Sequence, residues 1–227
     1  MRKLWLIFIA IFVFSFAVLG WVGTEIFRQA PPIPREVVTT DGQVLIPSEE
    51  ISNGQNVWQA MGGMESGSIW GHGSYVAPDW SADYLHREAV FILNEWSQKE
   101  FSNDYANLAS EQKAVLRQRL QDTIRKNTYD EATGRLTIEP VRARAFEDNL
   151  KHYTDIFTNG RTAYAVQRNA QADPAKLRQL NSFFFWTSWP RQPIVQTTQF
   201  PTPVIFPPSR WLATCRPAAP LSGQGSA

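Results

Sequence analysis

Histidine side chains are common metal ligands and acid–base groups, and this chain has three of them, far apart. His72, His86 and His152 lack the i, i+4 spacing and the paired cysteines that mark a metal site. The only cysteine, Cys215, excludes both an intrachain disulfide and a Cys-x-x-Cys pair. These side chains therefore predict no metal site in this chain.

Three carboxylates, Asp79, Asp83 and Glu88, have the chemistry for general acid–base catalysis. They stand at the start of a predicted helix, where the helix dipole stabilises acidic side chains. Their position therefore needs no catalytic explanation. The glycine-rich segment before them, residues 62–73, lacks the spacing of a phosphate-binding loop, and no serine occurs in Gly-x-Ser-x-Gly. We predict that the carboxylates open the helix, and that the chain has no catalytic or cofactor-binding residue.

An apolar segment near the N-terminus predicts how the chain is held. Residues 4–23 contain no charge and would span about 30 Å as a helix. A cleaved signal is the alternative, but its apolar core has roughly 7 to 15 residues, and Trp21 stands where small residues are required. Residues 1–30 are predicted to be a single-pass anchor in a bacterial inner membrane. Because Arg2 and Lys3 precede it, the rest of the chain is expected in the periplasm.

The remaining residues predict one folded domain and a tail. Lys and Arg number 22 against 21 Asp and Glu, without a basic stripe, so nucleic acid is not an expected partner. Apolar residues make up 43% of the chain, including nine Trp, which is enough for a core. Eight of the fifteen prolines follow Trp189. We predict a domain over residues 31–189 and a disordered tail over residues 190–227.

Local patterns predict a mainly helical domain with two small hairpins. Residues 37–40 and 43–46 flank Asp41-Gly42, which is typical of a type I′ turn, and a second hairpin is expected around Gly134. Apolar residues at steps of three and four predict five helices. Their expected starts are Ser48, Asp79, Ser110, Pro140 and Asp173-Pro174.

Two helix ends and one helix face are also predicted. The first helix is expected to stop at Gly62-Gly63, and the fourth at Asn159-Gly160 through a left-handed C-cap. The helix after Ser110 is expected to turn four apolar side chains inward. These are Val115, Leu116, Leu120 and Ile124.

Several segments together closely resemble the front part of bacterial quinol-dependent nitric oxide reductases. They are residues 53–59 (NGQNVWQ), 62–65 (GGME) and 71–83 (GHGSYVAPDWSAD), which follow the apolar N-terminal segment. The likeness continues through residues 85–88, 153–161 and 181–189, and covers about residues 1–189.

The resemblance implies a periplasmic domain with a cytochrome c-like fold that has lost its haem. The haem-bearing relatives carry Cys-x-x-Cys-His where this chain has residues 63–67, and Gly67 replaces the histidine. Met64 alone cannot hold an iron porphyrin. In the family, two b-type haems and a non-haem iron reduce two nitric oxide molecules to nitrous oxide in later membrane helices. We expect those helices, and therefore these cofactors, to be absent from this chain.

Two functional hypotheses remain open, and a third is disfavoured. The first is the anchor and haem-free domain of a quinol-dependent nitric oxide reductase, truncated by a shifted frame or early stop after Trp189 and inactive alone. The second is a stand-alone membrane-tethered periplasmic module that associates with a separate oxidase or reductase subunit. The expected partners are the lipid bilayer and the catalytic membrane portion. A haem-bearing electron carrier is disfavoured by the missing attachment motif.

Overall fold

A computed structural model describes residues 2–28, 31–71 and 77–189. The first element, α1 (Arg2–Arg28), exposes its apolar side chains, among them Leu19 and Phe27. Residues Lys3–Arg28 are long and apolar enough to cross a membrane, judged by length and composition only. The predicted anchor is therefore a candidate membrane span. The predictions for residues 190–227 fall outside the described residues.

Four short strands form one sheet in the order β2-β1-β4-β3. β1 (Glu36–Thr39) and β2 (Val44–Ile46) form the first predicted hairpin, and β3 (Tyr129–Asp130) and β4 (Arg135–Ile138) form the second. The hairpins are joined by a parallel pairing of β1 with β4. Both hairpins are confirmed, whereas the single sheet was not predicted.

The turn of the first hairpin corrects the predicted type I′ geometry, which needs two left-handed residues. Only Gly42 has a positive φ, at +87°. Thr39 accepts a hydrogen bond from Gly42 N and donates its own backbone N–H to Gln43 O. The Thr39 hydroxyl also accepts from Gln43 N at 3.0 Å, which favours the longer turn over the two-residue one.

The five predicted helices of the domain are present. They are α2 (Glu50–Ala60), α3 (Trp80–Phe101), α4 (Ser110–Arg125), α5 (Pro140–Asn159) and α6 (Pro174–Ser188). Single turns of 3-10 helix lie at Gly63–Ser66, Tyr105–Asn107 and Thr162–Tyr164. The mainly helical fold class is therefore confirmed.

Two predicted N-caps are wrong. The residue before α2 is Glu49, in a left-handed conformation without a side-chain cap, and not Ser48. Ser110 is the first residue of α4, where the Gln112 side chain instead accepts from Ala109 N at 3.1 Å. Asp173 does cap α6, because its carboxylate accepts from Ala175 N at 2.9 Å.

Two further local predictions need correction. Val115 is 64% exposed, whereas Leu116 is fully buried, because α4 packs mainly on α3 and so needs only a narrow apolar stripe. The helix α5 ends at Asn159 as predicted, but Gly160 has φ 76° and ψ 158°, which is not a left-handed C-cap. Glycine suits this position because a Cβ atom would lie 2.7 Å from Arg168 N.

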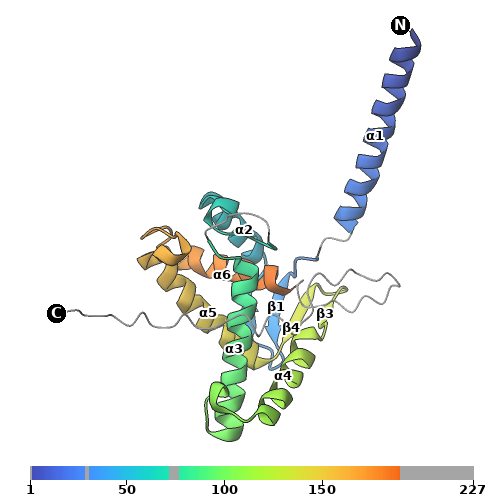
Figure 1. Ribbon diagram of the computed structural model, residues 1–227. Coiled ribbons are helices and arrows are strands. Elements are labelled where there is room, and N and C mark those ends of the chain that lie inside the picture. Colours follow the sequence, from blue (N-terminus) through green and yellow to red (C-terminus); the bar gives the residue numbers. More distant parts are fainter. Residues whose placement is uncertain (1, 29–30, 72–76, 190–227) are drawn as a thin grey trace, which may run out of the picture. The chain divides into compact units, whose positions relative to one another are not determined.

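The core is built around α6, which α2, α3 and α5 surround (Figure 1). Phe183, Phe184 and Phe185 are consecutive on α6, and each is at most 2% exposed. Trp80 of α3 stacks on Phe184 at 5.4 Å between ring centroids. α2 approaches α6 so closely that a Cβ atom on Gly54 would lie 1.9 Å from Gln179 O.

Candidate functional site

Asp79 caps α3 as predicted and also fixes the loop before it. One carboxylate oxygen accepts from Ala82 N at 2.8 Å. The other accepts from Ser68 Oγ at 3.1 Å and from the Gly71 backbone N–H. The carboxylate thus organises loop and helix, and this use accounts for its position. His72 lies outside the described residues.

Glu88 does not open the helix, which corrects the prediction. It lies more than two turns into α3, is fully buried, and faces Arg142 of α5. Arg142 Nε lies 2.6 Å from Glu88 Oε1, and Arg142 Nη2 lies 3.4 Å from Oε2. A charge this deep requires a partner, because desolvation alone would cost several kcal/mol. Glu88 and Arg142 form a buried ion pair that joins α3 to α5.

Tyr84 and Asn149 lie beside this ion pair and complete a polar interior between the two helices. Both are at most 1% exposed. Burial, and then the Glu88 charge, raise the pKa of Tyr84 well above its usual value. Neither Tyr84 Oη nor Asn149 Nδ2 has a hydrogen-bond partner of ordinary geometry among the described residues. These polar groups therefore lie in the interior between α3 and α5, out of contact with solvent.

A second polar group lies at the first turn of α3. Asp83 accepts from Arg87 Nε at 2.9 Å and from the Tyr153 hydroxyl at 3.0 Å. Burial, and then the Asp83 charge, raise the pKa of Tyr153 well above its usual value. Burial, and then the Arg87 charge, lower the pKa of His152. At neutral pH, Tyr153 is therefore protonated and His152 is neutral.

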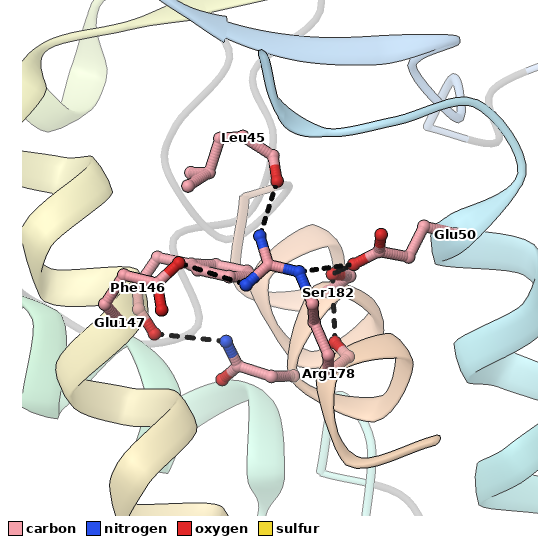
Figure 2. A network of polar contacts seen from close by, with 7 residues as sticks. Leu45, Glu50, Phe146, Glu147, Arg178 and Ser182 are labelled. Carbon is pink, nitrogen blue, oxygen red and sulfur yellow. Dashed lines mark hydrogen bonds and ion pairs between the residues drawn. The ribbon is translucent and has the colours of Figure 1, made fainter. Parts of the chain in front are cut away.

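Arg178 connects four elements of the domain (Figure 2). Its guanidinium donates to Leu45 O of β2 at 2.9 Å and lies 3.1 Å from Glu147 Oε1 of α5. It also lies 3.6 Å from Glu50 Oε1 of α2, which accepts from Ser182 Oγ of α6 at 2.6 Å. This network joins β2, α2, α5 and α6 around the core.

The segment that would carry a haem attachment does not fit the group. A Cβ atom on Gly67 would lie 1.9 Å from Trp80 Nε1, and Trp80 is completely buried. The same indole nitrogen donates to Ser66 O at 3.2 Å. An imidazole at position 67 therefore has no room unless Trp80 leaves the core. Met64 is 47% exposed and lies on the turn Gly63–Ser66.

Restoring the attachment motif is expected to disrupt the fold and not to produce a cytochrome. The triple variant Gly63→Cys, Ser66→Cys, Gly67→His should lose cooperative thermal unfolding, because the new imidazole displaces Trp80. It should also show no Soret band after co-expression with cytochrome c maturation proteins. Circular dichroism and absorbance spectra measure both results.

The double variant without Gly67→His is the matched control. It should keep the wild-type circular dichroism spectrum, with a loss of about 1–2 kcal/mol from the left-handed backbone at position 63. A folded triple variant with covalent haem would show that the segment accommodates the group.

The described part of the chain has one candidate membrane span followed by a mainly helical domain with a small sheet. Residues 34–193 match the family of the NorB cytochrome c-like domain of nitric oxide reductase, and the chain belongs to this family. The resemblance to nitric oxide reductases is thereby confirmed for the domain. A comparison with curated proteins found no match.

The structure brings together only some of the candidate side chains. Asp83 and His152 belong to one polar group, whereas Glu88 belongs to the buried ion pair and His86 to neither. Among the described residues, no three His, Cys, Asp or Glu side chains are grouped so that they could hold a metal ion. The ion pair was missed although a signal existed: Tyr84, Glu88 and Ile92 recur every four residues, so Glu88 lies on the buried stripe.

Proposed function

We propose that residues 1–189 are the membrane anchor and haem-free domain of a quinol-dependent nitric oxide reductase. In this proposal, metal centres on other membrane helices of the enzyme reduce two nitric oxide molecules to nitrous oxide. The supporting observation is that the family match covers the folded domain and that a candidate membrane span directly precedes it. The domain acts as a rigid support for the catalytic membrane portion.

The proposed orientation puts the domain on the periplasmic face of the inner membrane. Arg2 and Lys3 precede the apolar residues of α1, and positive charges favour the cytoplasmic side. The support role agrees with the interior of the domain. The Glu88–Arg142 pair and the Arg178 network join helices to one another, and the ion pair is closed to small molecules.

Nitric oxide consumption tests this proposal. Membranes that contain this chain alone should consume no more nitric oxide than empty membranes in the presence of a quinol, because three histidines cannot ligate two haems and a non-haem iron. Membranes with a quinol-dependent catalytic portion that lacks its own front domain should gain activity when this chain is co-expressed. A nitric oxide electrode measures both rates.

A chain that lacks residues 2–28 is the control, and it should restore less activity. Consumption by the chain alone, or no gain from co-expression, would contradict the proposal.

The DNA that follows the Trp189 codon shows whether the domain and the catalytic membrane portion are encoded as one polypeptide. Apolar helices in another frame would indicate one polypeptide, whereas an intergenic gap would indicate a separate subunit. Protease added to spheroplasts tests the orientation, and should cleave beyond Arg35.

A further inference from the structure

The chain enters the domain against the C-terminal end of α6. Trp186 Nε1 donates to Pro32 O at 3.0 Å. Pro32 lies four positions after Arg28, the last residue of α1, and four positions of chain span at most about 14 Å. The C-terminal end of α6 is therefore held within a short distance of the end of α1, whatever the angle between the anchor and the domain.

Trp70 presents an indole at this end of α6. Its Nε1 donates to Thr187 O at 2.7 Å, and its ring packs on Trp186 at 5.6 Å between centroids. The backbone of Trp70 is left-handed, with φ 57°, which is uncommon for a bulky residue and is kept only when surrounding contacts enforce it. The contacts with Thr187 and Trp186 hold this large apolar ring in place, and the Trp70 residue remains 37% exposed.

Ile33 follows Pro32 and is 44% exposed. The buried Trp186 contacts Pro32, the residue before Ile33, and also the Trp70 ring, so we call the two exposed side chains Ile33 and Trp70 the tryptophan face. Arg35, which follows Ile33 by two positions, is exposed. Arg28 is the last residue of α1. Exposed indole and aliphatic groups with cationic neighbours match the chemistry of a headgroup layer, which favours Trp and carries anionic phosphates.

We infer that the tryptophan face lies in the lipid headgroup layer of the membrane that α1 crosses. This inference rests on the proposed spanning role of α1. The 26 residues Lys3–Arg28 are about 39 Å long as a helix, whereas the hydrocarbon core is about 30 Å thick. Arg28 therefore reaches the headgroup layer, and the short connection to Pro32 keeps the tryptophan face beside it. The contact fixes the rotation of the domain on the membrane.

Depth-dependent fluorescence quenching tests the inference on the full chain in lipid nanodiscs. Cys215→Ser supplies a background without cysteine, and Ile33→Cys is labelled with an environment-sensitive fluorophore. With a spin label on the lipid headgroups, quenching at position 33 should be about twofold stronger than at the control Val115→Cys, because headgroup contact is short-ranged. Val115 is an exposed apolar residue on α4 and matches Ile33 in character.

Trp70→Asn removes the indole but keeps a residue that tolerates the left-handed backbone. In folded protein, checked by circular dichroism, it should reduce quenching at position 33 toward the level at position 115. Equal quenching at positions 33 and 115 in the protein that keeps Trp70 would overturn the inference. Quenching at position 33 that requires the catalytic membrane portion would also overturn it, in favour of a protein contact.

A label on Phe16→Cys, read with spin-labelled acyl chains, separates the two proposals. Quenching at position 16 without quenching at position 33 leaves the anchor intact and rejects only the tryptophan face. No quenching at position 16 would reject the membrane span, and with it both proposals.

Discussion

Gly54→Ala is expected to lower the free energy of unfolding of the domain by about 3 kcal/mol or more, or to prevent folding. A helical Gly→Ala change normally stabilises by about 1 kcal/mol. Here the sign reverses, because the new methyl group would lie 1.9 Å from Gln179 O and 2.8 Å from Phe183 Cβ. Relief requires α2 to move away from α6, on which the core is built. Urea denaturation followed by tryptophan fluorescence measures the change.

Asn53→Ala is the matched control, because Asn53 is the exposed neighbour of Gly54 in α2. Its effect should stay within about 0.5 kcal/mol, with a small gain from helix propensity. Equal stability of the two variants would show that α2 and α6 are not in such close contact.

Glu88→Gln is expected to destabilise the domain by about 3–5 kcal/mol. The amide removes the negative charge that faces the Arg142 guanidinium, which stays charged although Arg142 is only 4% exposed. Replacing Glu88 by a residue of equal size leaves the packing unchanged, so the loss reports electrostatics. The measurement is again the free energy of unfolding in urea.

The double variant Glu88→Gln, Arg142→Met is its control. It removes both charges, so it should recover most of the lost stability and end within about 1–2 kcal/mol of the wild type. A double variant as unstable as Glu88→Gln alone would mean that the two side chains are not coupled.

The sequence predicted best those features that depend on neighbouring residues. Asp79 and Asp173 cap their helices because each carboxylate reaches a free backbone N–H group in the first turn of its helix. The donor is Ala82 N for Asp79 and Ala175 N for Asp173. Pro140 begins α5 because the missing N–H of proline costs nothing there. The hairpin at Gly42 also follows from local chemistry, although its turn type depended on the Thr39 hydroxyl.

Features that depend on distant residues were missed. The Glu88–Arg142 pair joins residues 54 positions apart, and the Trp186–Pro32 hydrogen bond joins residues 154 apart. No periodicity within one segment specifies such a partner. The prediction for Glu88 failed because Glu88 lies more than two turns into α3, where the buried stripe of the helix and not its first turn decides the environment. The exposed Trp70 ring likewise depends on Thr187, 117 residues away.

The parallel pairing of β1 with β4 has a consequence for the order of folding. Glu36 and Arg135, which pair across the two strands, are 99 residues apart. At a synthesis rate of about 5–20 residues per second, β1 leaves the ribosome about 5 to 20 seconds before its partner. During that interval the first hairpin has one strand edge without its native neighbour, and such edges invite pairing with other chains. Pairing with β4 therefore closes an edge of the first hairpin that would otherwise be open to other chains.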